Sequence, residues 1–445
     1  MSNNIFAQQI ISLKEGIDIA VQQYPTIKAK QAVVKASEDL LAASHRDQLP
    51  NILLGVQQDY GTINGVNGAL YGFPGMVASS GPVLANQNWN AAFGSLYLTN
   101  VNWDFFSFGK FKEKNKVAQQ ALKRDIKDYE QEIFEQKIKV AAAYLNVVAS
   151  HQITASFEEN MLRADSIRLT VITRAKNGLV AGVDSSLANA QYSNARILYT
   201  NALDKEKEQK NILANLMGMD NSNFGIDMNF VTKIPAVYTD TVLEQHPVLQ
   251  YYKSIIDVSN QQVNFLKTQY YPTFTLIGVY QTRGSGFENT YGSDLSAYTQ
   301  NYWNGVKPVR SNYLIGVGVN WNFMNPIRFS KQVSAQKHFS EALEQSYKAE
   351  ELNIKTQMRI SDDKMNTALS NYNEAPVQVK AAADAYLQKT VMYKNGLATM
   401  VDVMQAASAL ITAETDMDVA YNNIWQALLL KAAAAGNFSL FEDQL

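Results

Sequence analysis

The sequence contains no cysteine. This absence excludes a disulfide framework and a thiolate zinc site from the 445 residues, and we expect no lipid attached to a Cys side chain. Only four histidines are present, and no two of them lie within 90 residues of each other. The sequence also has no HExxH pair, P-loop or GxSxG motif. No catalytic constellation is visible, so we expect no enzyme activity, no cofactor and no metal site.

Excess charge of one sign and long apolar runs are also missing. The 39 Lys and Arg residues nearly balance the 41 Asp and Glu residues, and the net charge of −2 argues against a nucleic-acid partner. Apolar residues make up 46% of the chain, yet mean hydropathy is −0.21, because much of the apolar content is Ala and Tyr. No run of 18 apolar residues exists, which argues against a transmembrane helix but leaves a transmembrane β-barrel open.

The N-terminal segment leaves two interpretations open. Residues 1–9 lack the apolar stretch of a signal peptide. The segment Phe6-Ala7-Gln8-Gln9 fits the remnant of a removed signal peptide and fits a native start equally well.

What the sequence does contain is an internal repeat with a period of about 220 residues. The matched pairs, first copy before second, are Tyr24-Pro25 and His246-Pro247, Leu49-Pro50 and Tyr271-Pro272, Asn102-Trp103-Asp104-Phe105 and Asn320-Trp321-Asn322-Phe323, Lys176-Asn177-Gly178-Leu179 and Lys394-Asn395-Gly396-Leu397, and Val183-Asp184 and Val401-Asp402. From Trp to the Asn of the Lys-Asn-Gly motif is 74 residues in both copies (177 − 103 and 395 − 321), which indicates a rigid element of fixed length. We therefore predict two structural repeats, residues 1–222 and 223–445.

A very long helix is expected in the first repeat. No Gly or Pro lies between Gly109 and Gly178, and the residues there favour helices. Apolar side chains recur every seven residues, as in a coiled-coil seam, at Ile126, Ile133, Val140 and Val147. A helix over 110–176 extends about 100 Å at about 1.5 Å per residue. A Gly turn follows, and then a return helix over 184–217.

The second repeat predicts the same pair of helices over 327–394 and 402–435. One difference is Pro376, which lacks a backbone donor and is expected to kink or break the first of them. A shorter helix is expected ahead of each repeat's first strand, over 26–48 and 248–269.

Two strand-like segments precede each long helix. Apolar and polar residues alternate in them, which predicts strands with one apolar and one polar face at 51–60, 95–106, 273–283 and 312–324. Each is about 10 residues long, enough to cross a bilayer as a tilted β-strand. The connections 61–94 and 284–311 are polar, rich in Gly and without helical periodicity, as is typical of the outer loops of membrane barrels. Trp103 and Trp321 are then expected at a membrane interface.

Four strands cannot close a membrane barrel, because barrels need about eight or more strands and no open edge can face lipid. The chain is therefore expected to pool its strands with copies of itself, giving 8 strands from two chains or 12 from three. The long helices are too polar to be buried all round. A ring of helices around a water-filled bore, with narrow apolar seams between neighbours, suits their composition.

The order of helix, strand, long loop, strand, very long helix, Gly turn and return helix, present twice, resembles the TolC-like outer membrane efflux proteins. The most specific local match is the turn from Lys176 to Asp184, with its second copy from Tyr393 to Asp402. The resemblance covers essentially the whole chain and rests on the spacing of the motifs in both copies.

The resemblance implies an α+β membrane protein that forms a homotrimer. Three chains contribute a 12-stranded β-barrel in the bacterial outer membrane, continued by an α-helical barrel that extends into the periplasm. It implies a passive exit duct for a tripartite efflux pump or a type I secretion system. The implied partners are a periplasmic adaptor protein, an inner-membrane transporter of the RND or ABC type, and outer-membrane lipid.

The resemblance also implies roles for residues at the turns. Gly178, Leu179, Gly396 and Leu397 lie at the periplasmic tips that contact the adaptor. Asp184 and Tyr393 match positions of a network that closes the entrance, and Asp402 matches an acidic ring at the constriction. Simpler roles stay open: a helix N-cap for each Asp and packing for Tyr393.

Two positions depart from the family pattern. Ala398 stands where the prototype has an Arg, and Gln405 stands where it has a second Asp. We therefore expect no salt-bridged latch of the prototype's kind and a weaker acidic ring.

Two other functions compete with the exit duct. A soluble periplasmic coiled-coil scaffold, with the strands as a small capping sheet, explains the helices but not the paired strands with their long loops. A periplasmic hydrolase has no supporting set of residues. The transported substrate, the particular pump and adaptor, and the resting state of the entrance are not determined by the sequence.

Overall fold

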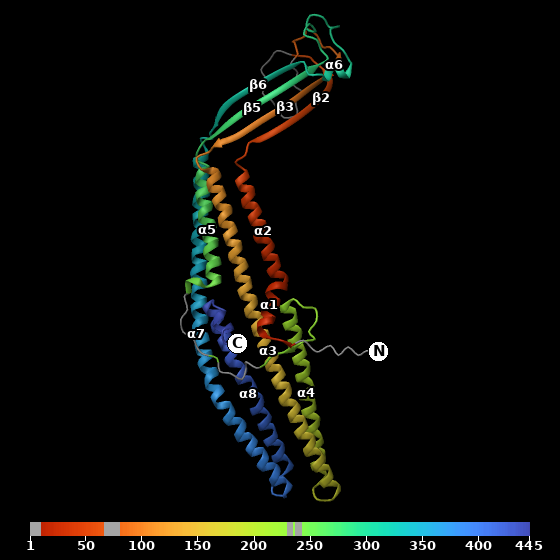
Figure 1. Cartoon of the computed structure of the whole chain (residues 1–445), viewed down its shortest axis with the longest axis vertical. Coiled ribbons are helices and arrows are strands. Elements are labelled where there is room, and N and C mark those ends of the chain that lie inside the picture. Colours follow the sequence, from red (N-terminus) through yellow and green to blue (C-terminus); the bar gives the residue numbers. More distant parts are fainter. Residues whose placement is uncertain (1–9, 66–80, 229–234, 236–242) are drawn as a thin grey trace. The chain divides into compact units, whose positions relative to one another are not determined.

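The computed structural model describes residues 10–65, 81–228, 235 and 243–445, which fold as two compact units (Figure 1). The first unit comprises residues up to Glu38, Gln120–Val258 and Phe339–Leu445, and the second comprises Asp39–Gln119 and Ser259–His338. The boundary falls inside four helices, α2 (Pro25–Arg46), α3 (Lys110–Lys176), α5 (Pro247–Thr268) and α7 (Asn325–Lys394). The segment Phe6–Gln9 and parts of both the first long connection and the inter-repeat linker lie outside the described residues.

The second unit is built on one antiparallel sheet in the order β2-β3-β5-β6 (Figure 1). Its strands are β2 (Asn51–Thr62), β3 (Ala91–Phe106), β5 (Thr273–Ser285) and β6 (Arg310–Asn320). The four strands therefore follow one another in the sheet in the same order as in the chain. Among the described residues, β2 and β6 are each paired along one edge only.

The register sorts the side chains into two unlike faces. Residues directly opposite each other share a face, as in the row Leu54, Thr99, Tyr280 and Tyr313. We call this side the apolar face, and its apolar members include Ile52, Leu54, Val56, Tyr60, Phe93, Tyr97, Val101, Trp103, Phe274, Leu276, Tyr280, Tyr313, Ile315, Val317 and Val319. The other side, which we call the polar face, is mixed. Its polar members include Gln57, Asp59, Asn100, Asn102, Gln281, Arg283, Arg310, Asn312 and Asn320, and its apolar members include Leu53, Leu96, Leu98, Ile277, Val279 and Leu314. Leu54 is 74% exposed and Tyr313 80% exposed, so the apolar face lies open in the single chain.

Two local predictions for this unit are wrong. Strand β6 ends at Asn320 and not at residue 324, because Asn322 caps a turn: its side chain accepts from the Met324 N–H at 3.0 Å and its carbonyl from the Asn325 N–H at 2.9 Å. The connection 284–311 was expected to contain no helix, but α6 (Tyr302–Val306) lies within it. The Asn301 side chain accepts from the Asn304 N–H at 3.2 Å and starts this short helix.

The first unit is helical and holds the main hydrophobic core. Besides the parts of α3 and α7 that belong to it, it contains α1 (Leu13–Gln23), α4 (Gly182–Met217), α8 (Met400–Ala435) and α9 (Ser439–Glu442). The fully buried side chains include Tyr144, Leu145, Leu213, Met217, Ile424 and Trp425. A small parallel pair, β1 (Ile10–Ile11) with β4 (Gly225–Ile226), and the 3-10 turn η1 (Leu243–Gln245) complete it.

Tyr144 ties the parallel strand pair to α3. Its buried hydroxyl donates to the Ile11 carbonyl at 2.8 Å and accepts from the Asp227 N–H at 2.8 Å. Burial raises the pKa of Tyr144. The hydroxyl therefore stays protonated and keeps both strands in place.

Helix α7 continues through Pro376 from Asn325 to Lys394, so the predicted break is wrong. Pro376 is exposed while its neighbour Ala375 is buried. Water can hydrogen-bond to the carbonyl that lacks its usual N–H partner because of Pro376. Packing on the buried side of the helix, at Ala375, preserves the helical conformation. A bend at this position stays a prediction. Among the described residues we find no helix whose length and hydropathy suffice to span a lipid bilayer.

Candidate functional site

The two Gly turns end α3 and α7 in the same way. Gly178 and Gly396 have φ values of 71° and 76°, in the left-handed region that glycine adopts without strain. The residue after each Gly donates to a carbonyl five positions earlier, Leu179 to Arg174 at 2.9 Å and Leu397 to Met392 at 2.8 Å. These bonds are those of a Schellman motif, which satisfies the last carbonyls of a helix. We call α3 and α4 the first hairpin and α7 and α8 the second hairpin (Figure 1).

Both turns present an apolar side chain to solvent. Leu179 is 66% exposed and Leu397 is 73% exposed. Exposed Leu at the same position of two hairpins is consistent with a partner surface. The predicted contact of Gly178, Leu179, Gly396 and Leu397 with an adaptor stays a prediction.

Asp184 and Tyr393, predicted to act together, are brought together between the two hairpins. The Tyr393 hydroxyl donates to Asp184 Oδ2 at 3.0 Å. Asp184 is not an N-cap: the N-cap of α4 is Ala181, and Asp184 lies in the first turn. Its carboxylate therefore lies at the positive end of α4 and accepts a hydrogen bond from the other hairpin.

Tyr393 also packs in a small apolar cluster. The cluster comprises the buried residues Val171, Ala188, Tyr393, Met400 and Val403, which come from both hairpins. Burial, together with the hydrogen bond to the Asp184 carboxylate, raises the pKa of Tyr393 to about 12. Tyr393 therefore remains a hydrogen-bond donor throughout the physiological pH range.

Arg174, which sequence reasoning missed, adds a second polar contact beside this pair. Its Nη1 donates to the Lys394 carbonyl at 2.5 Å, and its guanidinium lies 5.8 Å from the centre of the Tyr393 ring. Lys394 is the last residue of α7, so the cation meets the negative end of that helix. The available sequence signal was a basic residue in the last turn of a predicted helix, three positions before Asn177.

Asp402 has a capping role in the second hairpin. It forms a capping box with Thr399, in which Asp402 Oδ2 accepts from the Thr399 N–H at 2.9 Å and the Thr399 hydroxyl accepts from the Asp402 N–H at 3.2 Å. Lys389 Nζ lies 3.4 Å from its other oxygen. The backbone hydrogen bond from Thr399, followed by the one from its hydroxyl, lowers the pKa of Asp402. The role of Asp402 in an acidic ring stays a prediction.

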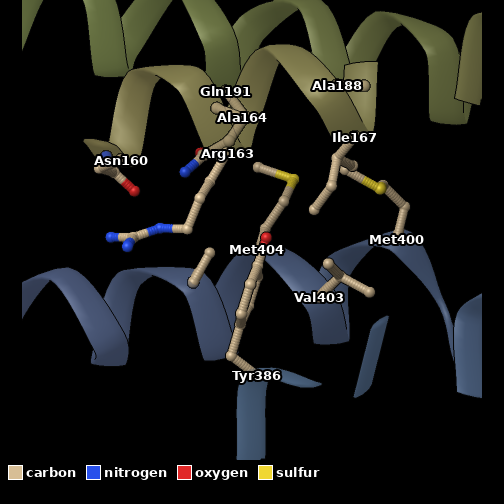
Figure 2. A pocket seen from close by; sticks show the side chains of 11 residues that line it. Asn160, Arg163, Ala164, Ile167, Ala188, Gln191, Tyr386, Met400, Val403 and Met404 are labelled. Carbon is tan, nitrogen blue, oxygen red and sulfur yellow. The ribbon is translucent and has the colours of Figure 1, made fainter. Parts of the chain in front are cut away.

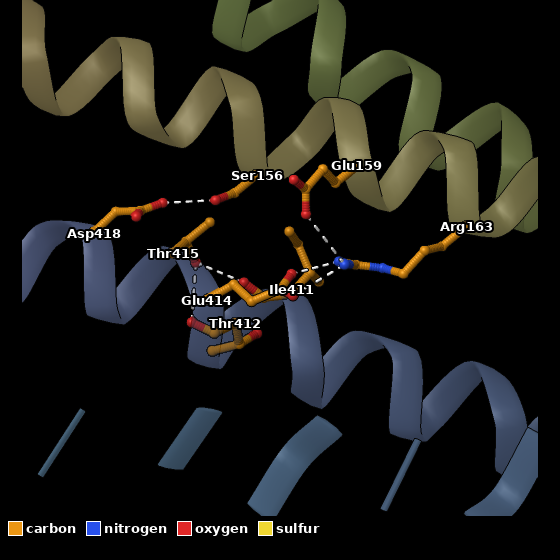
Figure 3. Close-up of polar contacts among 8 residues, drawn as sticks. All are labelled: Ser156, Glu159, Arg163, Ile411, Thr412, Glu414, Thr415 and Asp418. Carbon is orange, nitrogen blue, oxygen red and sulfur yellow. Dashed lines mark hydrogen bonds and ion pairs between the residues drawn. The ribbon is translucent and has the colours of Figure 1, made fainter. Parts of the chain in front are cut away.

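Further along the hairpins, α3 and α8 are joined by a group of polar contacts (Figure 3). Arg163 forms a bidentate pair with Glu414 in which Nη1 lies 3.0 Å from Oε1, and Glu159 lies 3.8 Å from the same guanidinium. The Ser156 hydroxyl donates to Asp418 Oδ2 at 2.7 Å. Burial raises the pKa of Asp418. No sequence motif had pointed to this group, because its members lie about 250 residues apart in the chain.

A small pocket lies between this group and the turns (Figure 2). Arg163 and Ile167 reach it from α3, and Met400 and Met404 reach it from α8, with Tyr386 of α7 at its edge. Flexible thioether side chains fill irregular gaps, so this region can repack when the hairpins move. The pocket belongs to the contact between the hairpins.

Trp103 and Trp321, in the second unit, make equivalent hydrogen bonds. The Trp103 indole N–H donates to the Gln48 carbonyl at 2.8 Å, and that of Trp321 donates to the Tyr270 carbonyl at 3.1 Å. Gln48 lies in the turn between α2 and β2, and Tyr270 lies in the turn between α5 and β5. Both rings are partly exposed, at 38% and 48%. Their predicted place at a membrane interface stays a prediction.

The fold is that of known outer-membrane proteins. No protein-family model matches the sequence, and no curated protein is detectably similar to it. Solved structures match closely in fold. The CmeC outer membrane channel of Campylobacter jejuni gives a TM-score of 0.76 at 14% identity, covering 95% of this chain and 85% of that one.

Two further matches agree. The outer membrane protein VceC of Vibrio cholerae gives a TM-score of 0.73 at 16% identity, with 96% of each chain covered. The open state of the MtrE outer membrane channel of Neisseria gonorrhoeae gives 0.71 at 14% identity, covering 96% of this chain and 89% of that one. The chain thus has the TolC-like fold of these outer-membrane channels, as the resemblance in its sequence leads us to expect.

Proposed function

We propose that this protein is a trimeric channel-tunnel of the bacterial outer membrane that extends into the periplasm. It serves as the passive exit duct of a tripartite efflux pump or a type I secretion system, and an adaptor protein opens it at the Gly turns. The observation that carries the proposal is the four-stranded sheet, which has an exposed apolar face, a second face that carries most of the charged and amide side chains, and two edge strands, β2 and β6, each paired along one side only within the described part of the chain.

Such a sheet suits a place between lipid and water. The apolar face contacts lipid, and the polar face lines a water-filled interior. Free strand edges are not tolerated in a bilayer, so β2 of one chain pairs with β6 of the next. Three chains then give the 12 strands that the resemblance implies, and six hairpins from the same three chains surround the tunnel.

The proposed gate consists of the contacts between the hairpins. The Tyr393–Asp184 hydrogen bond and the Arg174–Lys394 hydrogen bond hold the two turns of one chain together. An adaptor that binds the separated arrangement more tightly shifts the equilibrium toward it. The adaptor in turn couples the duct to an inner-membrane transporter of the RND or ABC type.

The lipid-facing role is tested by placing a charge on each face of β6. Ile315 (77% exposed) is on the apolar face and its neighbour Leu314 (56% exposed) is on the polar face. Ile315→Lys is expected to lose about 2–4 kcal/mol of insertion free energy near the bilayer midplane, and Leu314→Lys is the matched control. Insertion into lipid and single-channel conductance are measured. Equal behaviour of the two variants, or a wild-type protein that needs no detergent and does not conduct, contradicts the proposal.

A wild-type protein that needs no detergent and does not conduct favours the alternative function, a soluble coiled-coil scaffold.

The adaptor contact has a separate test, because Leu179 and Leu397 are exposed and can be replaced by Ser without disturbing a core. The double variant is expected to conduct normally and to lose co-purification with the adaptor from cell envelopes. Unchanged co-purification removes the two Leu residues from the proposed contact.

A further inference from the structure

We propose that residues 299–307, which include α6, lie on the lipid side of the sheet and seat at the headgroup boundary of the membrane, with Trp303 contacting lipid. We call residues 299–307 the rim segment. The inference rests on the proposed membrane function. It goes beyond it by assigning a part of a loop, not of the sheet, to the lipid contact.

Glycine geometry places the rim segment directly over the apolar face. Gly284 of β5 lies opposite Ser95, which lies opposite Gln58, and all three belong to that face. A Cβ added to Gly284 meets the Lys307 carbonyl oxygen at 2.5 Å and the Gly305 carbonyl oxygen at 2.7 Å. The backbone of the rim segment therefore approaches the sheet so closely that only Gly fits beneath it.

A second close approach comes from the rim segment itself. A Cβ added to Gly305 lies 2.5 Å from Cβ of Phe93, on the neighbouring strand β3. The rim segment thus touches two adjacent strands at their loop end. Both contacts fall within the second unit.

The rim segment also satisfies the polar side chains at this end of the apolar face. The Ser95 hydroxyl donates to the Val306 carbonyl at 2.9 Å, and Ser95 is buried as a result. The Tyr302 hydroxyl donates to Gln58 Oε1 at 2.8 Å, and the Tyr97 hydroxyl donates to the Val306 carbonyl at 3.2 Å. Polar groups without partners are costly against lipid, so this arrangement makes the loop end of the face compatible with the membrane.

Trp303 points outward from the covered site. It is 75% exposed, and its ring centre lies 5.1 Å from that of Tyr302, which in turn lies 5.2 Å from Phe93. Trp and Tyr favour the boundary between acyl chains and headgroups, where an apolar ring and a polar N–H or O–H are both accommodated. These three rings form an aromatic row at the loop end of the sheet.

The distance to the opposite aromatic row fits a bilayer. Phe93 and Trp103 are ten residues apart on β3, which is about 33 Å along a strand. At a strand tilt of about 40° the separation is about 25 Å along the membrane normal, equal to the apolar band of about 25 Å in membrane barrels. Trp103 and Trp321 therefore mark one boundary, and the rim segment marks the other.

Fluorescence quenching by brominated lipid tests this placement in the full-length protein. The protein is reconstituted in phosphatidylcholine brominated on the acyl chain close to the headgroup, and the quenched signal is compared between wild type and Trp→Phe variants at positions 103, 303 and 425. Trp303→Phe is expected to remove as large a quenched component as Trp103→Phe. Trp425 is 1% exposed in the helical core, so Trp425→Phe removes only unquenched signal.

Two glycine variants test whether the quenching of Trp303 depends on the position of the rim segment, without removing any Trp. Gly284→Ala displaces the rim segment and is expected to reduce quenching of Trp303 while leaving that of Trp103 unchanged. Gly278→Ala is the matched control on the same strand and face, because its Cβ meets only the Val101 Cβ at an ordinary 3.6 Å. Circular dichroism verifies that each variant is folded.

The outcomes distinguish this inference from the proposed function. Quenching of Trp103 without quenching of Trp303 overturns the rim assignment and leaves the membrane barrel intact. Absence of quenching at both positions overturns the proposed membrane function and the rim assignment with it.

Discussion

Removing one hydroxyl from Tyr393 tests whether the contact between the hairpins acts as a latch. In Tyr393→Phe the ring keeps its packing against Val171 and Met400, and only the donor to Asp184 is lost. A hydrogen bond to a charged group contributes about 1.5–3 kcal/mol. Because Asp184 is partly exposed and regains water, we expect about 1–2 kcal/mol, which is a factor of about 5–30 in an equilibrium.

Single-channel recording measures this shift. If the bond exists only in the closed arrangement, the ratio of open to closed channels rises by that factor in Tyr393→Phe. Tyr192→Phe is the matched control, since Tyr192 lies under Arg168 within the first hairpin and Phe preserves this ring contact. An open fraction of Tyr393→Phe within about twofold of wild type, in channels that still conduct, refutes the latch.

A double-mutant cycle separates the bond from other effects of the substitutions. Asp184→Ala and Tyr393→Phe are combined, and residues in direct contact are expected to be non-additive. If the bond is the latch, the double variant opens no more readily than the more open of the two single variants. Strict additivity means that the two residues act independently.

Two further predictions concern the first unit. Burial raises the pKa of Glu206, but hydrogen bonds from Lys210 and His151 outweigh it, so its pKa lies below the usual value. Because the pKa of Glu206 is lower in the folded state than the unfolded value of 4.5, its ionised carboxylate stabilises the fold above pH 4.5, and this stabilisation is lost as pH falls through the lowered pKa. Glu206→Gln is therefore expected to lower the free energy of unfolding by about 1–2 kcal/mol at neutral pH. In denaturant titrations the stabilities of the two proteins are expected to converge once the pH is below that lowered pKa. Gly436→Ala places a Cβ 2.6 Å from the His246 ring at φ 68°, whereas Gly396→Ala at φ 76° meets nothing within 4 Å. Gly436→Ala is expected to lose more stability than Gly396→Ala, because Gly396→Ala costs only about 1–2 kcal/mol of left-handed backbone strain. Equal decreases in the thermal unfolding temperature of the two variants contradict the steric argument.

The fold class was accessible from the sequence because its signals are periodic and local. The alternation of apolar and polar residues in β6 indicates a strand, and the absence of Gly and Pro between Gly109 and Gly178 indicates a helix. The Gly turns were accessible for the same reason, since a left-handed residue after a helix favours Gly. The strand end at Asn320 was missed because it depends on a hydrogen-bonded turn at Asn322 that alternation does not reveal.

The candidate site was accessible only in part. Asp184 and Tyr393 were paired through the family resemblance, because residues about 200 positions apart carry no local sign of contact. Arg174 and the Arg163–Glu414 pair were missed, since a charged residue on a long helix ordinarily indicates only a solvated surface.

The sequence by itself determined the internal repeat, the strand pairs, the very long helices and the position of both turns. Each of these follows from the order of residue types along the chain, through backbone preference and side-chain periodicity. Only the tertiary structure decided that Tyr393 bonds to Asp184, that Asp402 caps its own helix, and that the rim segment covers the loop end of the apolar face. These depend on which surfaces meet when distant segments pack, and the geometry of that packing is not written in any local pattern.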